Sequence, residues 1–168
     1  MKFIASVGPG FLGLQLYHAL RVIDEQGDAA LDEIGLDLPS RLSSTLIALK
    51  RYGPMSAADI SRLLDLPHQL TAQRIRHLRE RRLIREERDP ADRRRIIITL
   101  SDKGADQAEA LDRFAEEIGR VYEAVFEEIG ADLHAAIAAF QRALTAKPLS
   151  ERHNELFGEA VKKALKNG

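Results

Sequence analysis

The sequence predicts a mainly helical fold with one small β-hairpin. Apolar residues recur at helical spacing along most of the 168 residues, and one short isoleucine-rich run beside a turn signal favours strands instead. Hydrophobic residues make up 45% of the chain, which is enough for the core of about one domain. Cysteine is absent, which excludes disulfides and thiolate metal sites.

The N-terminal third of the chain predicts two helices. Residues 11–23 place leucines at helical spacing, and the loop signal at residues 25–28 would end this helix. A second helix is expected over residues 41–52, since Gly53-Pro54 ends its apolar pattern. The first residues resemble a signal peptide in composition, but Gly8-Pro9-Gly10 interrupts them. We therefore expect a cytoplasmic protein without a membrane span.

Two short helices joined by a tight turn follow. Ser56 is a favourable N-cap for a helix over residues 57–65, and Pro67 begins the next helix, over 68–82, without loss of a needed N–H. The side chains expected to face inward from the first of these helices are Ile60, Leu63 and Leu64. Such a pair, with arginines on its second helix, is typical of a helix-turn-helix.

A hairpin and a long helix come next. The runs 83–87 and 94–100 flank the turn signal Asp89-Pro90-Ala91-Asp92, and the isoleucine and threonine of the second run favour a strand. Ser101 then caps a helix whose first turn contains Asp102, where an acidic residue suits the helix dipole.

The long helix carries an apolar stripe, and two further helices are expected after it, over residues 133–144 and around residues 156–165. The stripe consists of Leu111, Phe114, Ile118, Val121, Tyr122, Val125 and Ile129, with Phe126 at its edge. The preceding elements are too small to cover so much apolar surface. We interpret the stripe as core and subunit interface, and we expect a two-fold dimer.

Charge is segregated along the chain, although the formal net charge is only −1. Residues 68–95 contain ten arginines and five acidic residues, whereas residues 101–130 contain nine acidic and three basic residues. The first stretch is suited to an anionic partner. A solvated, salt-bridged helix face would also explain arginines placed beside Glu80, Glu86 and Glu87.

Residues 53–104 resemble a known family. The segments "GPMSAADISRLLDLP" and "RRLIREERDPADRRRIIITLSDKG" are similar to those of the MarR (multiple antibiotic resistance regulator) family. The most specific feature is the wing signature Asp89-Pro90-x-Asp92-Arg93-Arg94, followed by Leu100-Ser101-x-x-Gly104. The resemblance implies a winged helix-turn-helix DNA-binding region over residues 37–104, with dimerisation helices over residues 1–36 and 105–168.

The chain departs from the family pattern at two places. Arg82-Leu83-Ile84 stands where the family usually has Gly-Leu-Val, so we expect the left-handed turn that glycine eases to be made in another way. Thr71 takes a position that is normally apolar, one turn before Ile75, and Leu70 stands beside it, so the sequence leaves the rotation of this helix open by one residue.

The expected DNA contacts lie first on the second helix of the pair. With Ile75 and Leu78 buried, glutamine and arginine side chains lie on the opposite face, where they can read base edges in a major groove. These candidates are Gln69, Gln73 and Arg76, with His77 at the edge of the face. His68, at the helix N-terminus, is expected near a phosphate.

The hairpin tip supplies the other candidates for DNA contact. Arg93, Arg94 and Arg95 project from a narrow ribbon that can enter a minor groove or follow the DNA backbone. The resemblance implies that Arg94 inserts into the groove and that Asp92 holds an arginine in place.

Other kinds of site have less support. Tyr17, His18 and Arg21 lie close together on the first helix and are candidates for a ligand pocket, although packing between helices explains the tyrosine equally well. The five histidines show no metal-ligand spacing, and no nucleophile with a paired base is evident. We therefore expect neither an enzyme nor a metal or cofactor site.

Together these features predict a transcriptional regulator. We expect a homodimeric repressor that binds a pseudo-palindromic operator in double-stranded DNA. The resemblance adds a small aromatic or phenolic effector to which the repressor responds. The alternative is a winged-helix protein-interaction module without specific DNA binding.

Overall fold

The structure is a computed structural model that describes residues 6 and 8–166 of the chain. The chain divides into two compact units, Met1–Ala115 and Glu116–Gly168, which we describe separately. Helices dominate both units, and the three strands that the described residues form all lie in the first unit. The predicted fold class, mainly helical with a small β-hairpin, is confirmed.

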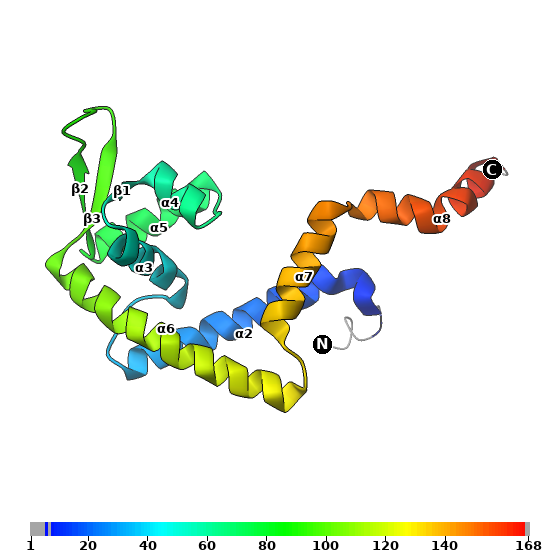
Figure 1. The fold of residues 1–168 in the computed structure, drawn as a ribbon, viewed down its shortest axis with the longest axis horizontal. Coiled ribbons are helices and arrows are strands. Elements are labelled where there is room, and N and C mark those ends of the chain that lie inside the picture. The colour runs from blue at the N-terminus through cyan, green and yellow to red at the C-terminus, as the bar shows by residue number, and fades with distance from the viewer. Residues whose placement is uncertain (1–5, 7, 167–168) are drawn as a thin grey trace. The chain divides into compact units, whose positions relative to one another are not determined.

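The first unit holds the predicted helix-turn-helix and hairpin. Its elements are η1 (Gly8–Phe11), α2 (Leu12–Glu33), η2 (Ser40–Leu42), α3 (Ser43–Tyr52), β1 (Met55–Ser56), α4 (Ala57–Leu63), α5 (His68–Glu80), β2 (Ile84–Arg88), β3 (Ile96–Leu100) and the first half of α6 (Asp102–Ile129). The hairpin of β2 and β3 projects beyond the helices α3, α4 and α5 (Figure 1). A narrow ribbon therefore extends from a helical base.

Helix α2 is longer than the sequence predicts, because the loop expected at residues 25–28 is helical. Gly27 lies against Ser40, and a Cβ on Gly27 would come within 3.0 Å of the Ser40 Cβ. The neighbouring Asp28 carboxylate accepts a hydrogen bond of 2.6 Å from the Ser40 backbone N–H. These small and polar residues thus make a tertiary contact between α2 and η2. In the sequence, glycine and aspartate with this role give the same local signal as a loop.

The sheet has a third strand that the sequence analysis missed. Its order is β1-β3-β2, and both pairs are antiparallel. In the β1 pair, Met55 lies opposite Ile98, which in turn lies opposite Glu86 on the other side. A strand of two residues has no periodicity to detect, which explains why it was not predicted.

The helix α4 begins as predicted but buries a different face. Ser56 forms a capping box with Asp59, as a good N-cap should. Ile60 is buried and Leu64 is half-buried, but Leu63 is 42% exposed, so its inward assignment was wrong. Positions 60, 61 and 64 share one side of a helix, and Ser61 takes the inward place, donating a hydrogen bond of 2.7 Å to the Leu66 carbonyl.

The junction between the helix-turn-helix and the hairpin contains a strained residue. Arg82 has a φ of 57°, in the left-handed region that glycine adopts easily. The expectation that this turn would be made in another way was therefore wrong: arginine adopts the same conformation. Its backbone is held there because the Arg82 carbonyl accepts a hydrogen bond of 2.7 Å from the Ser101 hydroxyl.

We expect Arg82→Gly to stabilise the protein by about 1 kcal/mol, because glycine relieves the steric cost of the left-handed conformation. Arg81→Gly is the matched control, since Arg81 has an ordinary φ of −84° and glycine there should destabilise the protein. Urea unfolding followed by circular dichroism measures both variants. Equal destabilisation by the two glycines would contradict the strain at Arg82.

Gly104 lies where α6 meets the hairpin. A Cβ at this position would be 1.8 Å from the Leu83 carbonyl oxygen, so no larger residue fits without a backbone shift. The same oxygen accepts a hydrogen bond of 3.0 Å from the Ser101 N–H, and the Ser101 hydroxyl accepts one of 3.0 Å from the Gly104 N–H. The Ser-x-x-Gly pattern therefore closes the joint between α6 and the start of β2.

The second unit consists of the C-terminal half of α6, α7 (Leu133–Ala146) and α8 (Leu149–Lys166). Its part of the predicted stripe is exposed in the single chain: Val121 is 55%, Val125 41% and Ile129 56% exposed. Among the residues that the structure describes, no helix has both the length and the apolar character needed to cross a membrane.

Candidate nucleic-acid interface

The orientation of α5 follows from three buried side chains. Thr71, Ile75 and Leu78 are buried, which confirms the predicted inward side of this helix and the place of Thr71 on it. The Thr71 hydroxyl bonds to the Pro67 carbonyl at 3.3 Å, so the polar side chain is satisfied within the helix. The rotation of α5 about its axis is thereby fixed.

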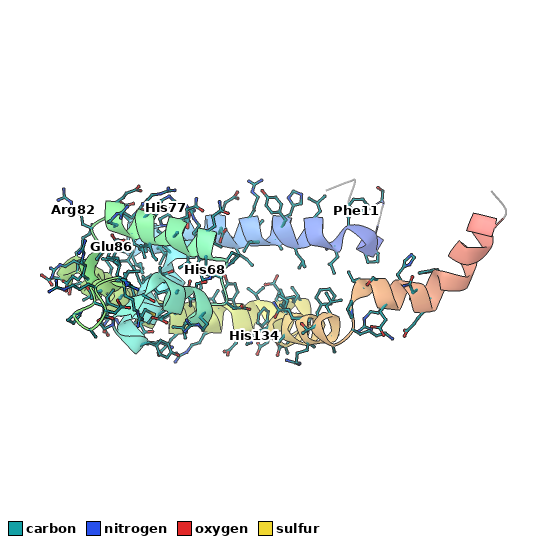
Figure 2. The ribbon with its side chains drawn as sticks, turned by 90° about the horizontal axis from the view of Figure 1, so that it is seen from above. Phe11, His68, His77, Arg82, Glu86 and His134 are labelled. Carbon is teal, nitrogen blue, oxygen red and sulfur yellow. The ribbon has the colours of Figure 1, made fainter. Side chains whose placement is uncertain are left out.

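The opposite side of α5 presents the predicted contact residues. His68, Gln69, Gln73 and Arg76 are exposed, and His77 is half-buried. His68 lies at the first turn of the helix and His77 near its other end (Figure 2). The structure thus brings together donors, acceptors and a positive charge on one exposed face, the combination that reads base edges.

The arginines of this region divide into paired and unpaired groups. The paired contacts are Arg79 with Glu86 at 3.0 Å, Arg85 with Asp102 at 3.2 Å, Arg95 with Asp59 at 2.9 Å, and Arg74 with the Ser44 hydroxyl at 2.9 Å. Within the described part of the chain, no acidic side chain lies within 4 Å of the charged groups of Arg76, Arg93 or Arg94. Salt bridges within the protein therefore explain some of these arginines. Arg76 on the face of α5, and Arg93 and Arg94 at the wing tip, remain available to contact an anionic partner.

The wing signature forms a hydrogen-bonded loop between β2 and β3. The Asp92 carboxylate accepts a hydrogen bond of 3.0 Å from the Arg94 backbone N–H, and the Asp89 carboxylate accepts one of 2.8 Å from the Ala91 N–H. Both are the local turns that aspartate favours. Asp92 thus holds Arg94 through the backbone and leaves the Arg94 side chain exposed.

Asp59, which the sequence analysis did not select, connects the wing to α4. Its carboxylate accepts hydrogen bonds from the Ser56 hydroxyl at 2.6 Å and from the Arg95 guanidinium at 2.9 Å. The hydrogen bonds from Ser56, together with the charges of Arg95 and Arg62, lower the pKa of Asp59. The capping pattern Ser56-x-x-Asp59 was visible in the sequence, but a contact across 36 positions has no local signal.

A groove lies between α5 and the sheet, with a volume of about 320 Å³. Its lining residues are Ala57, Ala72, Ile75, Arg76, Arg79, Glu86, Ile96 and Ile98. Arg76 lines this groove and Ile96 lies in it at the base of the wing tip. The exposed side of α5 and the hairpin therefore border the same concave surface.

The predicted ligand residues lie on α2. The rings of Tyr17 and His18 are edge-to-face with centroids 5.8 Å apart, and Tyr17 is 55% exposed. The Arg21 guanidinium is 2.7 Å from Glu25, which raises its pKa. The three side chains are thus neighbours on an exposed part of one helix, and their role in ligand binding stays a prediction.

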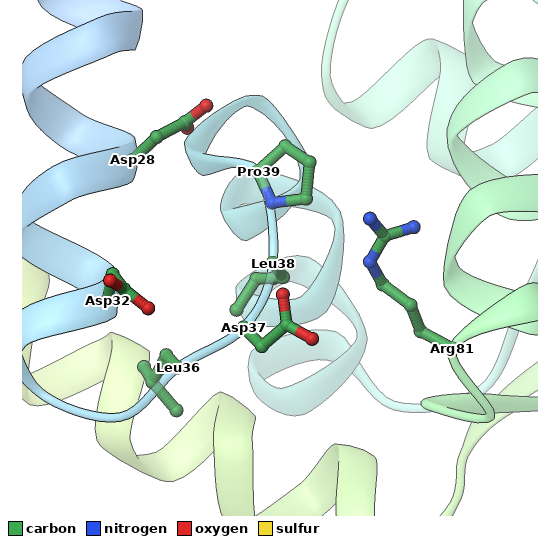
Figure 3. Close-up of a pocket in the computed structure, with 7 residues that line it drawn as sticks. All are labelled: Asp28, Asp32, Leu36, Asp37, Leu38, Pro39 and Arg81. Atoms are coloured by element: carbon green, nitrogen blue, oxygen red, sulfur yellow. The ribbon is translucent and has the colours of Figure 1, made fainter.

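Another cavity, of about 200 Å³, lies between α2, the following loop and the end of α5 (Figure 3). Three carboxylates, those of Asp28, Asp32 and Asp37, and the guanidinium of Arg81 line it together with Leu36, Leu38 and Pro39. This cavity could not be predicted from the sequence, because its residues come from segments that carry no recognisable motif.

Comparison with known proteins connects these features to one family. Residues 36–95 match the model of the MarR family. Over 109 residues the chain is 28% identical to the HTH-type transcriptional repressor NicR of Pseudomonas putida, and the match covers 64% of this chain and 69% of NicR.

Solved structures give the same result for the fold. The S. aureus MepR–DNA complex has a TM-score of 0.64 and 21% identity, over 82% of this chain and 98% of MepR. BpsR of Bordetella bronchiseptica, whose DNA binding is regulated by 6-hydroxynicotinic acid, has a TM-score of 0.55 and 25% identity, over 76% of this chain and 91% of BpsR. The matched residues 36–95 contain the helix-turn-helix and the wing tip described above, so this part of the chain is similar to the MarR family in both sequence and fold.

Proposed function

We propose that the protein is a DNA-binding transcriptional repressor that acts as a homodimer on a pseudo-palindromic operator. The observation that carries this proposal is the placement of unpaired arginines: Arg76 on the exposed face of α5 and Arg93 and Arg94 at the wing tip. Such groups contact phosphates and base edges. The relation to the repressor NicR supports the same activity, and an operator on the chromosome implies a cytoplasmic protein.

The proposed contacts use two grooves of the DNA. Gln69, Gln73 and Arg76 would read the major groove, with His77 at the edge of this face and His68 beside a phosphate. Arg93 and Arg94 would reach the adjacent minor groove or its backbone. Arg76 lines the groove of about 320 Å³ between α5 and the sheet, and Ile96 lies in it at the base of the wing tip, so the two sets of contacts border the same surface.

The proposed dimer uses the terminal helices. Residues 37–104 would form the DNA-binding region, and residues 1–36 and 105–168 the dimerisation helices. The exposed side chains of Val121, Val125 and Ile129 support this division, because a single chain leaves them in water. A two-fold dimer would direct two copies of α5 to successive major grooves, about one helical turn apart.

We propose further that a small aromatic acid controls DNA binding. BpsR, regulated by 6-hydroxynicotinic acid, supports this class of effector, and Tyr17, His18 and Arg21 offer stacking surfaces and a positive charge. We expect 6-hydroxynicotinic acid, added to a preformed complex with DNA, to weaken binding between about fivefold and 150-fold, as the coupling energy of ~1 to ~3 kcal/mol implies. Unchanged affinity would reject this effector while leaving the DNA-binding function intact.

Arg94→Ala tests DNA binding directly. We expect the wild-type protein to bind a duplex from beside its own gene far more tightly than a scrambled duplex, with an affinity that falls steeply with salt. The variant should lower the log–log salt slope by about 0.9 for each phosphate contact that it loses. Fluorescence anisotropy over a salt series measures both quantities.

Arg113→Ala is the matched control for this experiment, because it removes the same charge from an exposed position on α6 that is paired with Glu109. Its salt slope should equal that of the wild-type protein. Weak binding that is equal for both duplexes and unchanged by Arg94→Ala would instead favour a protein-interaction module.

A further inference from the structure

We propose that Arg95 is a positioning residue, whose ion pair with Asp59 fixes the wing tip against the helix-turn-helix so that Arg93 and Arg94 face DNA. This inference rests on the proposed DNA-binding function and assigns Arg95 a role different from that of its two neighbours. It also assigns a function to Asp59, a residue of α4 that lies outside the wing.

The Asp59 carboxylate is well placed to act as a fixed anchor. One oxygen accepts hydrogen bonds from the Ser56 hydroxyl at 2.6 Å and the Ser56 N–H at 3.3 Å, and the other lies 3.1 Å from Arg62. The capping box therefore fixes the position of the Asp59 carboxylate independently of any contact with the wing. Because the side chain is held at both oxygens, its bond to Arg95 constrains Arg95 more than a mobile surface acid would.

Arg95 is also held on the wing side. Its backbone N–H donates to the Asp92 carbonyl at 2.9 Å, and its carbonyl accepts from the Asp89 N–H at 3.0 Å. Its guanidinium lies 3.9 Å from the Asp89 carboxylate as well as 2.9 Å from Asp59. Arg95 is thus a bridge with one end in the loop that carries Arg93 and Arg94 and the other end at the start of α4.

The same contacts argue against Arg95 as an ordinary phosphate ligand. Two carboxylates, those of Asp59 and Asp89, already lie near its guanidinium, and a phosphate would have to compete with both. Arg93 and Arg94 have no such competitors among the residues that the structure describes. Of the three consecutive arginines, Arg95 therefore forms an ion pair within the protein, whereas the guanidinium groups of Arg93 and Arg94 are free to contact DNA.

The first test needs no DNA. Because the chain has no cysteine, Ala91→Cys gives a single site at the wing tip for a nitroxide spin label in the full-length protein. We expect both Asp59→Asn and Arg95→Gln to increase the mobility of the label. Arg88→Gln is the control, because it removes a positive charge at the wing end of β2 that makes no ion pair within the described part of the chain, and it should leave the mobility unchanged. Unchanged mobility in Asp59→Asn and Arg95→Gln would overturn the proposal.

The second test uses the sign of the effect of Asp59→Asn on operator affinity. If Arg95 positions the wing, this variant should weaken binding by roughly fivefold for each wing, and the double variant with Arg95→Gln should bind no more weakly than either single variant. The salt slope should stay that of the wild-type protein. If Arg95 contacts phosphate directly, Asp59→Asn should free it and tighten binding, and Arg95→Gln should lower the slope, which would overturn the proposal.

The two tests separate this inference from the proposed function. A wild-type protein that fails to distinguish operator from scrambled DNA would reject the function, whereas the label at position 91 would still report whether the ion pair holds the wing. A wild-type protein that binds specifically, combined with an immobile label in Asp59→Asn, would reject only the role of Arg95.

Discussion

Gly104→Ala should destabilise the protein by more than about 3 kcal/mol, at the upper end of what overpacking costs. The added methyl group would lie 1.8 Å from the Leu83 carbonyl oxygen and 2.8 Å from the carbonyl carbon, and backbone atoms cannot turn away as a side chain does. The oxygen also accepts the Ser101 N–H, so moving it breaks a hydrogen bond of 3.0 Å at the joint of α6. Urea unfolding at a fixed protein concentration measures the loss.

Gly119→Ala provides the control for this prediction. Gly119 lies in the same helix with no atom within 4 Å of the position of an added Cβ, so alanine should stabilise the helix by up to about 1 kcal/mol. Opposite signs for the two variants would identify the contact with Leu83 as the cause. A Gly104→Ala protein as stable as the wild type would show that the joint between α6 and β2 can open.

Val125→Asp should convert the proposed dimer into single chains and reduce operator affinity at least a hundredfold. A charge in the exposed apolar stripe of α6 would have to be buried in the dimer, at a cost of several kcal/mol, and the helix already carries many acidic residues. A single chain can contact only one half-site of the operator, so it loses the additional affinity that a dimer gains by binding both half-sites simultaneously. Analytical ultracentrifugation should give the mass of one chain, 18.7 kDa.

The control is Glu123→Ala, which changes an exposed residue on the other side of α6 and should leave the dimer intact. Far-UV circular dichroism would verify that both variants keep their helices. A Val125→Asp protein that stays dimeric would place the subunit interface elsewhere, and a monomer that binds the operator as tightly as the wild type would contradict the need for a dimer.

The parts of the interface that could be predicted from the sequence are those with local signals. The inward side of α5 follows from the spacing of Ile75 and Leu78, although the sequence left the rotation of this helix open by one residue until Thr71 was found buried. The wing loop follows from two aspartates that bond to the backbone two residues later. The capping box at Ser56 is likewise contained in four consecutive residues. In each of these three cases, the residues that form the sequence pattern also make the contacts that determine the local structure.

The parts that could not be predicted depend on tertiary contacts. Gly27 and Asp28 have the composition of a loop, but their contacts with Ser40 stabilise a helix there. Arg95 has the sequence context of an unpaired charge, but it forms an ion pair with Asp59. Arg82 shows the same limit, because glycine is the usual residue in its conformation but the hydrogen bond from Ser101 holds an arginine there. Chain position alone does not distinguish the bound arginine of the wing tip from the two unpaired ones.

The strand order β1-β3-β2 also affects how the wing behaves between molecules. The isoleucine-rich strand β3 would be a strong aggregation segment if its edges were open, but it lies in the centre of the sheet, with β2 paired along its whole length and β1 covering Ile97 and Ile98. Of the two edge strands, β1 has only two residues, and β2 is the longer one, whose exposed residues Arg85, Glu86, Glu87 and Arg88 all carry charge. Charged edges resist pairing with a strand of another molecule. The ribbon can therefore extend into water at high protein concentration without joining wings of neighbouring molecules into a continuous sheet.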